Sequence, residues 1–522
     1  MSAWRQALAA AEACLAAGVA EFVVCGGARN AALLEALARA EQAGGIRVWH
    51  HFEERGAGFF ALGRTMATGQ PCAVVTTSGT AAAELLPAVI EASYQARPLL
   101  VVTADRPERF RHSGAPQTIV QPGLFGGYAA VAGFAAWDGR GPLHLNVELE
   151  EDLDCGASPA EWRIGGFAPR YDRPVVAGLA RWLRQDRHRG LAVMVGGLEP
   201  GEREEVFHFC HALGAPVVAD AASGLREALG HLSLPDGDRL LAARPPGKIL
   251  RLGELPSGRF WRDLEALPDT AVWSVCRNGL PGLARPAEVL LGPLERVLPA
   301  LGEIEEVGDV LDLLSQRSSR QARMDELLEA WPDSEPALVR ALSGFAALGS
   351  GVYLGNSLPV REWNLFAQTA LPVAYVRANR GANGIDGQLS TWLGWSADAP
   401  DAWAVVGDLT ALYDLAAGGF LPQVTTQGRR LVVINNQGGA IFSRLPRLSD
   451  LSARAASWLR NSHQADLGGF AKLWGVDYRR VRTADDFDAI PDGEAPLLIE
   501  IQPDPSQTAA FWQDWDRVQF RA

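Results

Sequence analysis

Two clusters of polar residues in the last third of the chain follow two short apolar runs. The runs, residues 402–406 and 431–434, have the length and the β-branched content of buried parallel strands. Gly407-Asp408 follows the first run, and the sequence Asn-Asn-Gln-Gly at residues 435–438 follows the second. In an open α/β sheet, ligands bind outside the carboxyl ends of the strands, so both clusters are expected to face one crevice.

The ligand chemistry of these clusters suits a hard cation. The Asp408 carboxylate, the Asn436 amide oxygen and a carbonyl of the glycine-containing loop are ligands of the kind that Mg²⁺ binds, together with water and substrate phosphate oxygens. Gly-Asp and Asn-Gly pairs are also common turn formers, which is the alternative interpretation. The clusters lie 28 residues apart, the length of a helix and two short connections, and their pairing at neighbouring strand ends favours a site.

Three positions in the first third combine a strand end with reactive or anion-binding residue types. A strand ending near Trp49 leads into Glu53 and Glu54 at the start of a helix, where acidic side chains often act only as partners of the helix dipole. The glycine turn 26–30 joins a strand to a helix and could receive an anion, although tight packing is the simpler explanation. Residues 77–81, Thr-Ser-Gly-Thr-Ala, open a helix that we expect their hydroxyls to cap.

The elements that position these residues alternate between strand and helix, which indicates α/β domains with doubly wound parallel sheets. The 522 residues suggest three domains of about 150 residues, and we place them at 1–170, 171–330 and 331–522. The expected strands are 21–25, 46–49, 71–77, 98–103 and 142–148 in the first domain, 191–195, 216–220, 249–252, 270–274 and 289–291 in the second, and 351–355, 373–375, 402–406, 431–434 and 497–501 in the third.

Composition excludes several classes of protein. A net charge of −13 argues against a protein that coats nucleic acid. The six cysteines are scattered without a Cys-x-x-Cys pair, which excludes a zinc ribbon and a disulfide framework and indicates a reducing, cytoplasmic location. We find no signal peptide, and no apolar run approaches the length of about 18 residues that a membrane span needs.

Several stretches resemble thiamin-diphosphate enzymes, and within them the branch of 2-succinyl-5-enolpyruvyl-6-hydroxy-3-cyclohexene-1-carboxylate synthases (the MenD branch). The stretches are His51-Phe-Glu-Glu-Arg-Gly, Thr76-Thr-Ser-Gly-Thr-Ala, Thr103-Ala-Asp-Arg-Pro, Gln121-Pro-Gly-Leu-Phe, Gly355-Asn-Ser-Leu-Pro-Val-Arg, Asn379-Arg-Gly-Ala-Asn-Gly-Ile-Asp-Gly and Gly407-Asp-Leu-Thr-Ala-Leu-Tyr-Asp-Leu. They occur in order in both outer domains and are sparse in the middle one. The third residue of the metal motif, usually Gly, is Leu409, a departure shared by one branch of the family.

The resemblance implies thiamin diphosphate with Mg²⁺ or Mn²⁺ as cofactors. Glu54 matches the glutamate that hydrogen-bonds the aminopyrimidine ring and promotes loss of the thiazolium proton, a role that needs a pKa raised by burial. Asp408, Asn436 and Gly438 match the metal ligands. Ile385 is a candidate for the apolar wedge that bends the cofactor, with a plain core isoleucine as the alternative. The other implied cofactor contacts are Ser78, Gly79, Thr80, Leu409, Ile441 and Phe442.

The resemblance also implies the substrates 2-oxoglutarate, which is decarboxylated, and isochorismate, to which the resulting carbanion adds. Both carry carboxylates, which arginine can bind bidentately. Ser357 and Arg361 lie four residues apart, on one helix face if this stretch is helical, and could share a carboxylate. The full set of candidate substrate residues is Arg29, Arg106, Gln117, Ser357, Arg361 and Arg380.

The family's assembly places the glutamate-bearing domain of one subunit against the metal-bearing domain of another, so we expect a homodimer or a tetramer. Three departures fall on the isochorismate side: Ala28 replaces a serine, Pro116 replaces an asparagine, and a basic pair is reduced to Arg259 and Phe260. The alternative is therefore another thiamin-diphosphate carboligase or 2-oxoacid decarboxylase with a different acceptor. A non-catalytic paralogue is disfavoured by the presence of the glutamate and both metal side chains.

Overall fold

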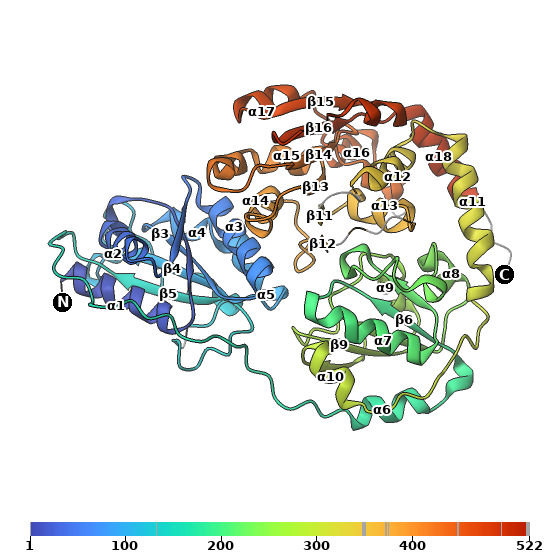
Figure 1. The fold of residues 1–522 in the computed structure, drawn as a ribbon, viewed down its shortest axis with the longest axis horizontal. Coiled ribbons are helices and arrows are strands. Elements are labelled where there is room, and N and C mark those ends of the chain that lie inside the picture. The colour runs from blue at the N-terminus through green and yellow to red at the C-terminus, as the bar shows by residue number, and fades with distance from the viewer. Residues whose placement is uncertain are drawn as a thin grey trace. The chain divides into compact units, whose positions relative to one another are not determined.

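The structure is a computed structural model that describes residues 2–131, 133–346, 351–370, 373, 375–445, 448–491 and 493–517. Within these residues the strands form three sheets, and every strand pair is parallel (Figure 1). The expected α/β fold with three parallel-sheet domains is confirmed.

The first sheet has the strand order β2-β1-β3-β4-β5. Its strands are β1 (Glu21–Val24), β2 (Arg47–His50), β3 (Cys72–Thr76), β4 (Leu99–Asp105) and β5 (Leu143–Glu148), and its helices are α1 (Ala3–Ala16), α2 (Ala31–Gln42), α3 (Glu54–Thr68), α4 (Thr80–Ala83) and α5 (Leu86–Tyr94). Every residue of β3 and β4 is buried, as in strands that are covered on both faces.

The second sheet has the order β10-β9-β8-β6-β7. Its strands are β6 (Leu191–Val195), β7 (Val217–Ala219), β8 (Lys248–Leu252), β9 (Ala271–Cys276) and β10 (Glu288–Leu291), and its helices are α6 (Ala177–Arg184), α7 (Arg203–Leu213), α8 (Gly237–Ala243), α9 (Phe260–Asp263) and α10 (Leu294–Ala300).

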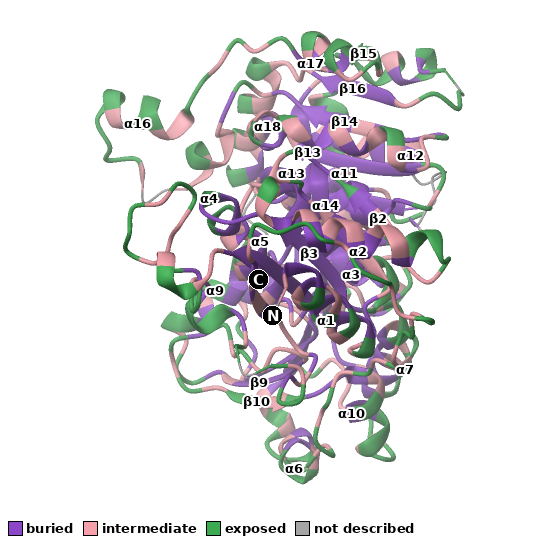
Figure 2. Cartoon of the chain, turned by 90° about the vertical axis from the view of Figure 1, so that its left-hand side faces the viewer, coloured by how far each residue is buried: buried purple, intermediate pink, exposed green. Residues whose placement is uncertain are grey.

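The third sheet has the order β12-β11-β13-β14-β16-β15. Its strands are β11 (Gly351–Leu354), β12 (Val376–Arg377), β13 (Ala402–Gly407), β14 (Arg430–Ile434), β15 (Asp477–Val481) and β16 (Leu497–Ile501). The helices from this part of the chain are α11 (Arg317–Ala330), α12 (Glu335–Ala346), α13 (Leu358–Phe366), α14 (Gln388–Trp395), α15 (Asp408–Tyr413), α16 (Ala453–Arg460), α17 (Leu467–Leu473) and α18 (Pro505–Arg517). In Figure 2 the central strands β13, β14 and β16 are buried, whereas α16 has no buried residue.

By their internal contacts, the segments of the chain group into two compact units. The first comprises the chain as far as Tyr171 together with Gly381–Ala399 and Leu412–Thr426, and the second comprises the remainder. In the first unit α14 packs directly on α3. The backbones are so close that a Cβ on Gly63 would lie only 2.2 Å from the Thr391 carbonyl oxygen. Only glycine permits backbones to approach so closely, so a segment from the last third of the chain completes the first unit.

The structure differs from our expectations in three elements. The crossover between the two polar clusters is not one helix but α15 followed by a 3-10 segment, Leu415–Gln423, which contains a glycine pair and Pro422 that disfavour an α-helix. Strand β15 was not expected, because its sequence Asp-Tyr-Arg-Arg-Val is polar and lies at a sheet edge. The strand expected at 373–375 is found at Val376–Arg377, and residue 374 lies outside the described residues.

No helix in the described part of the chain is long and apolar enough to cross a membrane. The six cysteines are free, and all but Cys155 are buried.

Candidate functional site

Asp408 connects the two polar clusters of the third sheet. It follows β13, it is 2% exposed, and its Oδ1 accepts a hydrogen bond from the Leu409 amide at 2.6 Å. Its Oδ2 accepts from the Gly438 amide at 2.8 Å, so the carboxylate bridges the loops that follow β13 and β14. Burial raises the pKa of the Asp408 carboxyl, against the opposing effect of these backbone donors. The structure thus brings the two clusters together at one edge of the sheet.

Asn436 presents an unpaired oxygen in the loop whose Gly438 amide binds Asp408. Its Nδ2 donates to both carboxylate oxygens of Glu335, at 3.0 and 3.1 Å, which fixes the orientation of the amide. Its Oδ1 is buried and has no hydrogen-bond partner among the described residues. Burial raises the pKa of Glu335, and burial together with the charge of Glu335 raises that of the neighbouring Glu362 well above its usual range. A buried amide oxygen without a donor fits a cation ligand.

Gly438 can supply a third oxygen. Its φ of +124° and the 2.4 Å that would separate a Cβ from the Arg460 carbonyl oxygen both require glycine. Its carbonyl accepts from the Ala440 amide at 2.8 Å and retains a second lone pair. No group of three or more His, Cys, Asp or Glu residues that could hold a metal occurs in the described residues. One carboxylate, one amide and one carbonyl therefore fit a hard cation that completes its shell with water and phosphate oxygens.

His463 lies next to Asp408, and Asn436 lines a cavity. The His463 Nε2 lies 3.2 Å from Asp408 Oδ2, and its Nδ1 accepts from the Ala465 amide, which places the ring proton on Nε2. The cavity has a volume of about 800 Å³, and its lining includes Glu335, Asn436 and Arg460. Arg460 Nη2 donates to the Asn436 carbonyl at 2.8 Å. This volume lies within the range of small-molecule sites.

Three apolar candidates lie near the loops that follow β13 and β14. Leu409 is half-buried at the start of α15. Ile441 and Phe442 lie in the 3-10 helix Ala440–Arg444 that follows the loop, the first half-buried and the second exposed. Their positions leave apolar surface accessible to a ligand next to the polar cluster.

In the second unit, Arg361 and Arg380 lie close enough for the charge of Arg380 to lower the pKa of Arg361. Arg361 Nη1 donates to the Ser357 carbonyl at 2.6 Å, where Ser357 precedes α13 with φ at +75°, a strained value for serine. Arg380 Nη1 donates to Asn356 Oδ1 at 2.8 Å, and its buried Nε has no partner among the described residues. Burial, followed by the charge of Arg380, lowers the pKa of Arg361 to about 10. Two partly desolvated cations favour an anionic ligand.

The structure shows how the two departures in the middle part of the chain, Arg259 and Phe260, are placed. Phe260 is fully buried within an apolar cluster and Arg259 is exposed, so Phe260 does not stand in for a substrate-binding base. The positive charge of Arg262 instead contributes to lowering the pKa of Arg361. A cation of this part of the chain therefore lies within electrostatic range of Arg361.

In the first unit, Glu53 and Glu54 have separate roles at the start of α3. Glu53 is the N-cap, and its carboxylate accepts from the amides of Arg55 and Gly56 at 3.0 and 2.8 Å. Glu54 is half-buried, and its pKa is raised by burial and by the charges of Glu53 and Glu84. Because Glu53 satisfies the helix terminus, Glu54 is available for a ligand.

The segment Ser78-Gly79-Thr80 is positioned by a buried glutamine. Gly79 has φ at +84° and its amide donates to Gln121 Oε1 at 2.9 Å. The expectation of a capping hydroxyl is wrong, because the N-cap of α4 is Gly79, without a side-chain cap. Ser78 is buried and Thr80 is exposed. Gln117 is also exposed, and its backbone lies against Gly79, since a Cβ there would be 3.1 Å from the Gln117 Cα.

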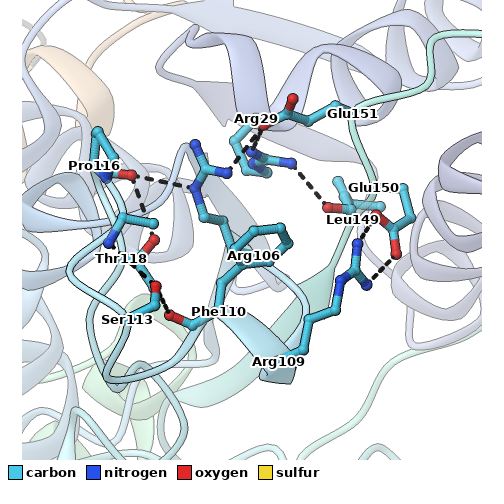
Figure 3. A network of polar contacts seen from close by, with 11 residues as sticks. Arg29, Arg106, Arg109, Phe110, Ser113, Pro116, Thr118, Leu149, Glu150 and Glu151 are labelled. Carbon is cyan, nitrogen blue, oxygen red and sulfur yellow. Dashed lines mark hydrogen bonds and ion pairs between the residues drawn. The ribbon is translucent and has the colours of Figure 1, made fainter.

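Arg29 and Arg106 converge on one carboxylate, as Figure 3 shows. Arg29 Nη2 lies 2.5 Å and Arg106 Nη1 3.0 Å from the same oxygen, Glu151 Oε1. Arg29 belongs to the 3-10 turn Ala28–Asn30 after β1, and Arg106 follows β4, so two strand ends present the pair.

Ile385 belongs to a loop that is fastened to the first unit. The buried Glu91 accepts hydrogen bonds from the Gly381 and Ala382 amides, both at 2.7 Å. Ile385 follows in this loop and is half-buried, so it is not a plain core isoleucine.

Four residues that contact the candidate site residues were not identified from the sequence. They are Asn356, Glu335, Gln121 and His463, which contact Arg380, Asn436, Gly79 and Asp408, respectively. Asn356 and Gln121 lie within motifs that carried the family resemblance, which was the available signal. Glu335 and His463 lie far from Asn436 and Asp408 in the sequence and gave no signal of their own.

Comparison with known proteins gives consistent matches. Residues 6–124 match the family model described as "Thiamine pyrophosphate enzyme, N-terminal TPP binding domain". A 2-succinyl-5-enolpyruvyl-6-hydroxy-3-cyclohexene-1-carboxylate synthase from Akkermansia muciniphila is 50% identical over 511 residues, covering 95% of each chain. Proteins of the same name from Bdellovibrio bacteriovorus and Myxococcus xanthus are 38% and 32% identical, covering 96% of both chains in the first case and 92% and 90% in the second.

Proposed function

Because the chain belongs to the family of 2-succinyl-5-enolpyruvyl-6-hydroxy-3-cyclohexene-1-carboxylate synthases, we propose that it decarboxylates 2-oxoglutarate and transfers the remaining four-carbon unit to isochorismate, in menaquinone biosynthesis. It is a thiamin-diphosphate-dependent enzyme, in the class of transferases. The observation that most supports a working cofactor site is the buried, unpaired Oδ1 of Asn436 beside Asp408.

The metal-binding proposal uses the residues at the carboxyl ends of β13 and β14. Asp408, Asn436 and Gly438 would hold Mg²⁺ or Mn²⁺, and the cavity beside them would accommodate the diphosphate. Leu409, Ile441 and Phe442 would contact the apolar parts of the cofactor. When bound, thiamin diphosphate supplies the electron sink for decarboxylation, and the protein supplies orientation and electrostatics.

Glu54 is proposed as the catalytic carboxyl. Burial raises the pKa of Glu54, which favours the protonated form that could donate to the aminopyrimidine nitrogen. Ser78, Gly79 and Thr80 would form the wall around that ring, and Ile385 would support it from the loop that Glu91 anchors.

The arginines are proposed to hold the substrate carboxylates. Arg29 and Arg106 converge on a single carboxylate oxygen, which supports a role for this pair in binding one acid group of isochorismate. Arg361 and Arg380, with Ser357, would hold another. Gln117 would add a neutral polar contact from the loop over Gly79.

The proposed enzyme is a cytoplasmic homodimer or tetramer with domains at 1–170, 171–330 and 331–522. Each active site would combine the glutamate-bearing domain of one subunit with the metal-bearing domain of another. This arrangement would bring the two sets of functional residues described above into one site.

Product analysis by mass spectrometry tests the proposal. The protein is incubated with 2-oxoglutarate, isochorismate, Mg²⁺ and thiamin diphosphate, with an Asp408→Ala variant as control. The expected product has the mass of isochorismate plus the four-carbon unit that 2-oxoglutarate retains after losing carbon dioxide. Consumption of 2-oxoglutarate without this product would favour the second candidate, a carboligase or decarboxylase with another acceptor, which the Ala28 and Pro116 departures motivate.

A further inference from the structure

The carboxylate on which Arg29 and Arg106 converge belongs to the protein itself. Glu151 Oε1 accepts from Arg29 Nη2 at 2.5 Å and from Arg106 Nη1 at 3.0 Å (Figure 3). The side chains of the arginines are only 7% and 19% exposed, whereas that of Glu151 is 72% exposed. Two sheltered cations therefore share an anion that approaches them from the solvent side.

The two arginines have other contacts that hold them in place without Glu151. Arg29 Nη1 donates to the Leu149 carbonyl at 3.1 Å, and Arg106 Nε donates to the Pro116 carbonyl at 3.2 Å. The Arg106 guanidinium also lies 5.4 Å from the centre of the Phe110 ring. Among the described residues, the side chain of Glu151 forms hydrogen bonds and ion pairs only with these two arginines, and an ion pair with an exposed carboxylate contributes little to stability. The arginine pair can therefore keep its geometry when Glu151 leaves.

We propose that Glu151 is an internal carboxylate that occupies the Arg29–Arg106 pair until a carboxylate of the acceptor substrate displaces it. This inference rests on the proposed function of the arginine pair. Competition by Glu151 would lower the apparent affinity of the protein for the acceptor, because the acceptor binds only the fraction of molecules in which the arginines are free. A ligand without an anionic group cannot displace Glu151, so the contact also discriminates against neutral ligands.

The charge state of Glu151 supports this competition. The hydrogen bond and charge of Arg29, and then the charge of Arg106, lower the pKa of the Glu151 carboxyl. It is therefore ionised at neutral pH and offers the same chemistry as a substrate carboxylate.

The neighbouring residue provides a matched control. Glu150 is a half-buried carboxylate of this segment, and it pairs with Arg109 at 2.6 and 2.7 Å. Substituting either glutamate by alanine removes the same charge from adjacent positions, and only one of the two substitutions releases the Arg29–Arg106 pair.

The first measurement needs no substrate. Phenylglyoxal, which modifies arginine side chains, is added to wild type, Glu151→Ala and Glu150→Ala, and the adducts at each arginine are followed by peptide mass spectrometry. We expect faster modification of Arg29 and Arg106 only in Glu151→Ala, and of Arg109 only in Glu150→Ala. Unchanged rates at Arg29 and Arg106 in Glu151→Ala would overturn the inference.

The second measurement is the KM for isochorismate. If the internal pair is populated as strongly as a typical exposed ion pair, Glu151→Ala should lower this KM by about two- to sixfold, with kcat and the KM for 2-oxoglutarate within about twofold of wild type. A higher KM would mean that Glu151 positions the arginines rather than competing, which contradicts the inference. No turnover of isochorismate by wild type would instead refute the proposed function, while the labelling rates still decide whether Glu151 occupies the pair.

Discussion

The side-chain amide of Asn436 donates to both carboxylate oxygens of Glu335, a residue 101 positions away in the sequence. This contact leaves the Asn436 oxygen as the only part of the amide free to meet a cation, and that oxygen has no partner among the described residues. Glu335 is 1% exposed and is the first residue of α12, so a helix far from the metal motif in sequence orients one of its ligands.

Substitution of Glu335 by alanine is therefore expected to weaken Mg²⁺ binding about 10- to 100-fold, the range typical of residues that orient a metal ligand. Without the acceptor, the Asn436 amide can rotate and present its nitrogen to the cation. Mg²⁺ titration in the presence of thiamin diphosphate measures the effect, with thermal unfolding of the metal-free variant as the folding control. Unchanged Mg²⁺ affinity in a folded variant would show that Glu335 does not orient the ligand.

Asp408→Ala is expected to abolish retention of the cofactor, because the diphosphate is proposed to be held mainly through the metal. The variant also removes the acceptor of the Leu409 and Gly438 amides, so circular dichroism should accompany the assay. Thiamin diphosphate that remains with the protein after gel filtration is quantified. Stoichiometric cofactor in the variant would refute the assignment of Asp408.

His144 should make the first unit sensitive to acid. Burial lowers its pKa to about 4 from an ordinary value near 6.5, so the folded protein resists protonation that the unfolded chain accepts. The free energy of unfolding therefore has its full value above pH 6.5. It decreases as the pH falls from 6.5 through 4, by at most about 3 kcal/mol. Urea unfolding at several pH values should show a smaller loss over this interval in His144→Gln. An equal loss in both proteins would contradict the prediction.

The assembly can be tested by mixing two inactive variants. Glu54→Gln and Asp408→Ala each disable a different half of the proposed shared site, so a hybrid dimer would contain one intact site. Activity should appear on mixing, in proportion to the hybrid population measured by native mass spectrometry. Confirmed subunit exchange without any recovery would mean that one subunit supplies both residues.

Much of the fold was predictable because the local pattern and the global structure agree. The apolar runs before Asp408 and Asn436 became buried neighbouring strands, as their composition indicated. The crossover between them was mispredicted because its glycine pair and Pro422 break the helix that its length suggested. The edge strand β15 was missed because an edge strand tolerates charged residues and lacks the apolar signal.

The candidate site was predictable at the level of residue types in motifs and less so at the level of their partners. The family resemblance singled out Glu54, but the sequence did not show that Glu53 caps the helix, because which carboxylate caps it depends on backbone geometry. The contact of Glu151 with Arg29 joins residues 122 positions apart, and no local pattern reports it. Such long-range pairs arise only when the chain is folded.

The proton transfer assigned to Glu54 is the central claim. Glu54→Gln preserves the shape of the side chain but cannot exchange a proton with the pyrimidine nitrogen, so turnover should fall by about 10²–10⁴-fold while cofactor binding persists. If Glu54 only stabilised the start of α3, the substitution would cost about 0.3–1 kcal/mol of stability and leave the rate nearly unchanged.

Deuterium exchange at the thiazolium carbon of the bound cofactor tests this claim most directly, because it needs no substrate and does not depend on the identity of the acceptor. Wild type and Glu54→Gln are loaded with thiamin diphosphate and Mg²⁺, mixed with deuterium oxide, and quenched in acid at successive times. Exchange that is slower by about two or more orders of magnitude in Glu54→Gln is the predicted result. Exchange as fast as in wild type would contradict the assignment of Glu54.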